Sequence, residues 1–207
     1  MHSTPTLAPV SAPQAVSKTH SVWRTSIRFT LVTAVLLGLG YPLLVTGLAA
    51  LFFPHHAGGS LIQLKDGTVI GSELLAQSFT SDRYFHPRPS AAGNGYDATA
   101  SGGSNLAQSS KTLVDRIQGS IDKLAAENPG KPVPIDLVTT SGSGLDPDIT
   151  PDAASFQAPR VAKARSIGED RILKLIEQQI KARQLGLFGE PRVNVLELNL
   201  ALDKLSK

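Results

Sequence analysis

Apolar residues dominate a run from Phe29 to Phe53, and this run is the strongest pattern in the 207-residue chain. The 25 positions carry no charge, and the next charged side chain after Arg28 is Lys65. A helix of this length spans roughly 37 Å, more than the hydrocarbon core of a bilayer at about 30 Å. The pattern therefore predicts one transmembrane helix over 29–53. A cleaved signal peptide is the alternative, but its apolar stretch is normally only about 7–15 residues.

After Pro54 the apolar residues occur in short segments separated by turn residues. Segments 60–64 and 68–79 flank Lys65-Asp66-Gly67. An Asp-Gly pair tolerates the positive φ angles that a tight turn needs, so these segments predict a β-hairpin. The following stretch, 86–110, has few aliphatic residues and is longer than an ordinary connection, which indicates a functional or disordered loop.

Helical periodicity dominates the rest of the chain. Residues 113–124 place Leu, Val and Ile at helical spacing, and Thr150-Pro151-Asp152 is a typical helix start. We expect a strand over 133–140, a short helix after Pro151, further helices over 159–166 and 168–184, a strand over 193–200 and a terminal helical turn over 201–205. The sequence predicts an α+β fold class, with one such domain over 54–207 following the single N-terminal transmembrane helix.

The charge distribution predicts the orientation of this helix. Residues 1–28 contain Lys18, Arg24 and Arg28 and no acidic residue. Subtracting these three from the 20 basic residues leaves 17, equal to the 17 acidic ones, so the net charge of +3 lies wholly before the span. The positive-inside rule then places a basic tail, 1–28, in the cytoplasm and the domain outside it, in the periplasm of a bacterium. Residues 1–20 have no periodic apolar face and are expected to be disordered. A nucleic-acid partner is not expected.

Small residues recur every four positions within the run, at Thr30, Ala34, Gly38, Pro42, Thr46 and Ala50. This spacing allows two membrane helices to approach closely. Four residues overshoot one α-helical turn, so the stripe should drift off one face after Gly38, and Pro42 should bend the helix. Two interpretations stay open: docking against other membrane helices, or the general richness of membrane spans in small residues.

Conventional catalytic patterns are absent from the sequence. The lack of cysteine excludes a thiol nucleophile, a CxxC pair, a disulfide and Cys-type zinc sites. No Gly-x-Ser-x-Gly, His-Glu-x-x-His or P-loop pattern occurs. No catalytic residue and no metal ligand is therefore predicted, and His55 and His56 are interpreted as interfacial residues at the end of the span.

Three polar clusters have a structural and a functional interpretation. Asp146, Asp148 and Asp152 lack the spacing of a calcium loop, which favours turn and cap roles. The glycine-rich turns 101–104 and 141–144 are followed by no lysine, which favours flexible turns over a phosphate site. The basic residues of segment 159–166 form either a solvated helix face or a docking patch for an acidic partner; they are Arg160, Lys163 and Arg165.

Several irregular segments together resemble one known family. They are GYPLL at 40–44, GSELL at 71–75, YFHPRPS at 84–90, ASGGSNL at 100–106, GLDPDITP at 144–151, PRVAKAR at 159–165 and VNVLELNLALD at 193–203. In this order they are similar to the KdpC family, the C subunits of the Kdp potassium-transporting ATPase, over residues 24–205.

The resemblance implies an accessory subunit in the bacterial inner membrane, single-pass, with a channel-like potassium-binding subunit and a P-type ATPase subunit as partners. KdpC is described as a catalytic chaperone that raises the ATP affinity of the ATPase subunit, while potassium is handled by a partner. By motif position, the family's proposed nucleotide-contacting glutamine is Gln157; the alternative is a helix-cap or surface residue. Docking of the span is expected through Thr30, Ala34, Gly38 and Pro42. The residues alone also permit a stand-alone, membrane-anchored ligand-binding or sensory domain.

Overall fold

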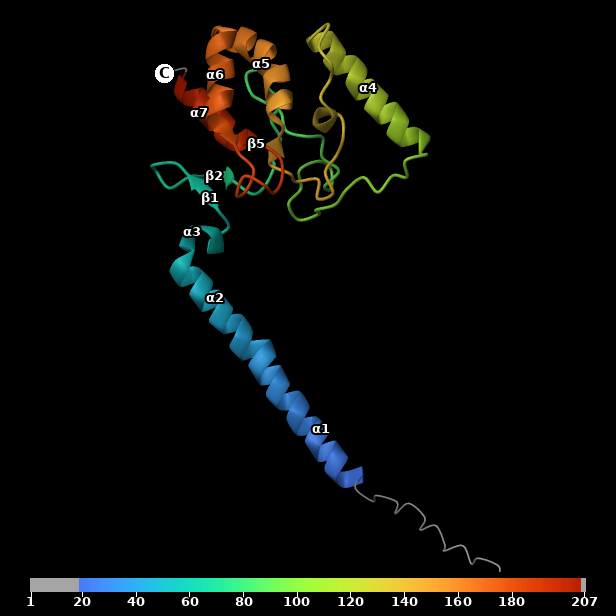
Figure 1. Cartoon of the computed structure of the whole chain (residues 1–207), viewed down its shortest axis with the longest axis vertical. Coiled ribbons are helices and arrows are strands. Elements are labelled where there is room, and N and C mark those ends of the chain that lie inside the picture. Colours follow the sequence, from blue (N-terminus) through green and yellow to red (C-terminus); the bar gives the residue numbers. More distant parts are fainter. Residues whose placement is uncertain (1–18, 206–207) are drawn as a thin grey trace, which may run out of the picture. The chain divides into compact units, whose positions relative to one another are not determined.

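The computed structural model describes residues 19–205, which belong to two compact units (Figure 1). The first ends at Ala57 and the second begins at Gly58. The disordered tail predicted over residues 1–20 lies, up to residue 18, outside the described residues. The α+β fold class with one N-terminal apolar helix is confirmed.

The first unit is helical throughout its described part. It consists of α1 (Thr19–Thr33), a π-helical segment (Ala34–Gly40), α2 (Tyr41–Phe52) and the short α3 (Pro54–Ala57). Residues Val22–Phe52 form a candidate membrane span with a mean hydropathy of 2.0 and no buried residues. The helix thus begins before the expected boundary at Phe29 and includes Arg24 and Arg28.

The π-helical segment is explained by Pro42. Proline has no N–H, so the carbonyl of Gly38 loses its α-helical donor, and the proline ring crowds that carbonyl. The Tyr41 N–H instead bonds to the carbonyl of Leu36, five residues back. This wider turn accommodates the proline while the helix continues.

The second unit opens with the predicted β-hairpin. Strands β1 (Leu61–Gln63) and β2 (Val69–Ser72) are antiparallel, and Leu61 lies opposite Ser72. The turn contains Gly67 at φ +84°, as the Asp-Gly signal predicts. The hairpin is confirmed, although its strands are shorter than the expected segments. After a long connection, α4 (Lys111–Glu127) confirms the amphipathic helix.

The strand expected over 133–140 is wrong. Residues Ile135–Leu137 form a 3-10 turn instead. The buried Asp136 carboxylate accepts hydrogen bonds from the Thr150 N–H (2.8 Å) and hydroxyl (3.3 Å), which ties this turn to the start of the next helix. A buried side chain that caps a distant backbone group overrides the local strand preference.

Two further expectations about the C-terminal half are also wrong. After β3 (Asp148–Ile149), one helix, α5 (Pro151–Arg165), replaces the two expected helices and contains Pro159 in its interior. The predicted strand over 193–200 is strand only in β5 (Arg192–Asn194), and α7 (Val195–Leu205) follows directly. The Asn194 side chain explains the change, because its carbonyl accepts from the Glu197 N–H (3.1 Å) and caps the new helix.

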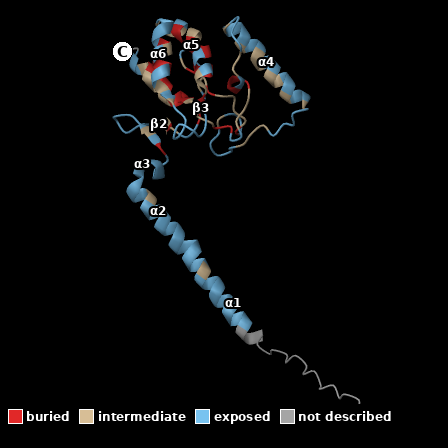
Figure 2. Ribbon diagram, in the orientation of Figure 1, coloured by how far each residue is buried: buried red, intermediate tan, exposed pale blue. Residues whose placement is uncertain are grey.

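The core lies among α5, α6 (Glu169–Gln179), α7 and a small antiparallel sheet. Strand β4 (Ile180–Lys181) directly follows α6, which ends earlier than the expected residue 184, and the strand order is β3-β5-β4. Figure 2 shows the buried residues gathered on α5 and α6, while the first unit is almost wholly exposed. The largest fully buried side chains include Phe85, Ile172 and Leu198. Phe85 comes from the long connection, so part of the loop region belongs to the core.

Candidate functional site

Two buried side-chain amides hold the backbone of Phe85 and His86. The Phe85 N–H donates to the Asn199 oxygen (2.8 Å), and the Asn199 amide donates back to the Phe85 carbonyl (3.0 Å). Gln157 makes the same pair of bonds with the His86 N–H (2.8 Å) and carbonyl (3.1 Å). We call Gln157 and Asn199 the amide clamp. It joins α5 and α7 to segment 84–90, three regions far apart in sequence.

The expected nucleotide-contacting residue, Gln157, is fully engaged inside the domain. Its nitrogen also donates to the Ala153 carbonyl (3.3 Å), and its oxygen also accepts from Arg160 (2.8 Å). Two donors and two acceptor positions are all that an amide side chain offers. With a residue exposure of 4%, Gln157 is neither a helix cap nor a surface residue, so that alternative is wrong. Nucleotide contact by Gln157 stays a prediction.

Two arginines of α5 form hydrogen bonds with the residues that come just before Phe85 and His86. Arg160 donates to the carbonyls of Asp82 (2.8 Å) and Tyr84 (3.1 Å) and lies 3.6 Å from a Glu127 carboxylate oxygen. Arg165 donates to the Arg83 carbonyl (2.7 Å).

The second arginine also closes a small network with α7. Arg165 pairs with Asp203 at 2.7 Å and lies 4.8 Å from the centre of the Tyr84 ring. The Tyr84 hydroxyl donates to the other Asp203 oxygen (3.1 Å). The side chains of Arg160 and Arg165 are only 13% and 2% exposed, whereas Lys163 is exposed. The three basic residues therefore do not form one exposed patch, and docking through this helix stays a prediction for Lys163.

The surroundings of the His86 imidazole beside the clamp shift its pKa in both directions, and the net effect is a lowering. Burial lowers the pKa of His86, and the nearby Arg160 guanidinium lowers it further. The ring nitrogen Nε2 lies 3.1 Å from the Ser81 carbonyl, an acceptor that fits a neutral ring with its proton on Nε2. Burial also lowers the pKa of Arg160, opposed by Glu127 and Asp82.

A groove of about 320 Å³ runs along the clamp. Its wall includes His86, Gln157 and Arg160 from the clamp region and Lys123 and Glu127 from α4. The groove combines positive, negative and amide groups, but Gln157 and Arg160 already have partners within the domain. It offers no nucleophile paired with a base.

The two glycine-rich turns pack on each other and present no open phosphate cradle. The Gly102 N–H donates to the Ser143 carbonyl (2.8 Å), and the Ser90 hydroxyl donates to the Gly144 carbonyl (2.6 Å). Gly144 has φ +67°, and a Cβ there would lie 2.6 Å from the Gly102 oxygen. Glycine is thus needed for close packing of these segments.

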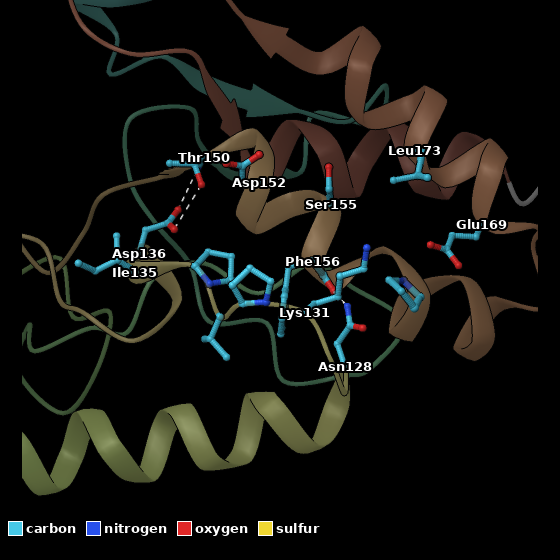
Figure 3. A pocket seen from close by; sticks show the side chains of 14 residues that line it. Asn128, Lys131, Ile135, Asp136, Thr150, Asp152, Ser155, Phe156, Glu169 and Leu173 are labelled. Carbon is cyan, nitrogen blue, oxygen red and sulfur yellow. Dashed lines mark hydrogen bonds between the residues drawn. The ribbon is translucent and has the colours of Figure 1, made fainter.

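A larger cavity, about 610 Å³, lies between α5, the start of α6 and segment 131–136 (Figure 3). Its wall is mostly apolar, with three prolines, Phe156 and Leu173. Figure 3 shows Asp136 turned toward Thr150, its hydrogen-bond partner. The charged side chains that line it are Lys131, Asp136, Asp152 and Glu169. Within residues 19–205, no group of three or more His, Asp or Glu side chains is arranged to hold a metal ion.

The aspartates of the predicted turn and cap cluster have separate partners. Asp146 pairs with Arg88 (3.0 Å), and Asp148 pairs with Arg192 (2.9 Å). Asp152 lies in the first turn of α5, where its negative charge interacts favourably with the positive end of the helix dipole. The turn and cap interpretation fits these positions.

The small residues expected to dock the span are all exposed in the isolated chain. Thr30, Ala34, Gly38 and Pro42 contact no second helix here, and a Cβ added at Gly38 meets no atom within 4 Å. Docking through this face stays a prediction.

Comparison with known proteins decides the family. The family model described as KdpC, K+-transporting ATPase, c chain, matches residues 23–204. The chain belongs to the KdpC family. A potassium-transporting ATPase KdpC subunit from Methylobacterium nodulans is 55% identical over 196 residues, covering 87% of this chain and 97% of the relative. The corresponding subunit from Acidobacterium capsulatum is 57% identical over 183 residues, covering 88% and 97%.

Membership in the KdpC family confirms the resemblance seen in the sequence, and the structure shows what its motifs do. Segment 84–90 and segment 193–203 meet at the amide clamp and at the pair of Arg165 with Asp203. Sequence reasoning missed Asn199 and Asp203 as partners of this site. The available signal was their spacing of four residues, which places both on one face of a helix, but Asn199 was assigned to the expected strand and only Asp203 to the terminal helical turn.

Proposed function

We propose that this KdpC subunit is a non-catalytic accessory subunit, which assembles and stabilises an ATP-driven potassium uptake complex and raises the ATP affinity of its P-type ATPase subunit. Membership in the KdpC family and the long exposed span support a complex over the alternative of a stand-alone ligand-binding or sensory domain. Potassium is then handled by the channel-like subunit, and ATP is hydrolysed by the ATPase subunit.

The proposed topology follows from charge and hydropathy. The described span carries Arg24 and Arg28 near its N-terminal end, and no charge follows until Lys65. The positive-inside rule then puts the N-terminus in the cytoplasm and the second unit in the periplasm, with the span in the bacterial inner membrane.

The observation that carries the mechanism is the complete engagement of Gln157. Its amide has no hydrogen-bonding position left for a nucleotide, and its loss would release His86 and Arg160. We infer that Gln157 supports the effect on ATP affinity by shaping the domain, and that the effect reaches the ATPase subunit through contacts between subunits. Direct ATP binding is not required of this chain.

The docking part of the proposal is tested on the span. A Cβ added at position 38 meets no atom within 4 Å, so we expect a defect of Gly38→Leu to report on a partner helix. Gly47→Leu is the matched control, because a Cβ added there is equally unhindered and position 47 does not belong to the four-residue repeat of small residues. We expect Gly38→Leu to reduce copurification with the two large subunits and Gly47→Leu to leave it intact. Normal assembly and potassium uptake with Gly38→Leu would contradict docking through this face.

A further inference from the structure

Three strongly exposed apolar side chains of the second unit gather at one turn, 184–189, between β4 and β5. Leu185, Leu187 and Phe188 are 93%, 71% and 60% exposed. The six residues read QLGLFG and carry no charge, while Arg183 and Glu190 form an ion pair directly at their ends. Exposed apolar residues gathered in this way mark an interaction site rather than ordinary surface.

The backbone of this turn is closed on itself. The N–H groups of Gln184 and Phe188 each donate to the other residue's carbonyl, both at 2.9 Å, and the Leu187 N–H donates to the Gln184 carbonyl (3.1 Å). Leu185 adopts φ +53°, a left-handed conformation uncommon for leucine. The turn therefore presents apolar side chains while several of its backbone N–H groups are paired within the turn, which lowers the cost of bringing it toward an apolar medium.

Hydrogen bonds connect the base of this turn to the point where the chain enters the second unit. The Asn194 amide, two residues into β5, donates to the Glu73 carbonyl (2.8 Å), and the Glu73 N–H donates to the Ser60 carbonyl (3.0 Å). In Figure 1 the loop leading into β5 lies at the same end of this unit as β1 and β2. Ser60 follows Phe52, the last residue of the candidate span, by only eight positions.

We propose that the 184–189 turn inserts Leu185, Leu187 and Phe188 into the interfacial region of the lipid bilayer, as a second membrane contact in addition to the span. A lipid surface is favoured over a protein pocket because the turn carries no charge, exposes Leu185 almost fully and is bounded by a pair of opposite charges that can stay at the headgroups. The inference rests on the proposed insertion of the span.

Tryptophan fluorescence tests this directly, because Trp23 is the only tryptophan of the chain. The double variant Trp23→Phe/Phe188→Trp moves the single reporter into the turn. The full chain is reconstituted in vesicles of phosphatidylethanolamine and phosphatidylglycerol, with or without bromine on the acyl chains. We expect a blue-shifted emission that brominated lipid quenches and that aqueous acrylamide quenches only weakly.

Two controls keep the outcomes separate. Trp23→Phe/Gln118→Trp places the reporter on the exposed surface of α4 and should show the reverse quenching pattern. In the unmodified chain, Trp23 reports on the span. If brominated lipid does not quench the Trp23 fluorescence, insertion of the span is refuted rather than insertion of the turn. If the reporter in the turn stays accessible to acrylamide while Trp23 is quenched by lipid, the proposal is wrong. Shielding of the turn only after the large Kdp subunits are added would also overturn it, in favour of a protein partner.

Discussion

Replacing Gln157 by leucine should destabilise the second unit strongly, because it removes four hydrogen bonds at a buried position. The His86 N–H and carbonyl and the Arg160 guanidinium each lose a partner. A buried polar group left unpaired costs about 1–3 kcal/mol, and partial rehydration of Arg160 reduces its share, so we expect a loss of about 2–5 kcal/mol. The isosteric Gln157→Glu should cost less, since its carboxylate still accepts from His86 and Arg160.

The assay is chemical denaturation of residues 58–207, the unit that contains the buried core, followed by circular dichroism. Gln178→Leu is the matched control, because Gln178 is exposed on α6 and should change stability by less than about 0.5 kcal/mol. If Gln157→Leu has the stability of the parent and yet abolishes the effect on ATP affinity, the structural role assigned to Gln157 is refuted.

Two further predictions concern the neighbours of the clamp. Arg165→Met should lower the free energy of unfolding by about 1–3 kcal/mol, because it removes a charged hydrogen bond to Asp203. Lys163→Met on the same helix should leave the stability nearly unchanged. Equal denaturation midpoints for the two variants would contradict the network. The pKa of His86 in the folded state lies below its ordinary value of 6.5. The unfolded chain therefore takes up a proton at this residue more readily than the folded chain. Stability should fall as the pH drops through about 6.5 toward the folded-state pKa. His86→Gln should flatten this part of the stability profile, and an unchanged slope would show that another group is responsible.

The span and the hairpin were predictable from sequence because their signals are local. A charge-free apolar run and an Asp-Gly turn do not depend on distant residues. The segment 193–200 was misassigned because alternating apolar residues also occur on a buried helix, and only the Asn194 cap decides between the two. The turn at 135–137 depends on Asp136 reaching Thr150, a contact that no local pattern reveals.

The candidate site was predictable only in part, for the same physical reason. Gln157 and the two arginines of α5 were recognised from their motif, but their burial was not, since arginine and glutamine are mostly surface residues. Arg165 is buried because Asp203 and Tyr84 approach it from other segments. The clamp needs three segments at once, and its second amide, Asn199, lay in the misassigned helix.

The most direct test of the account is photolabelling of the intact complex with an azido derivative of ATP. The account predicts label on the P-type ATPase subunit and none on this chain, while removal of this subunit weakens the apparent ATP affinity of the complex. Label recovered on the segment that contains Gln157, and competed by unmodified ATP, would contradict it.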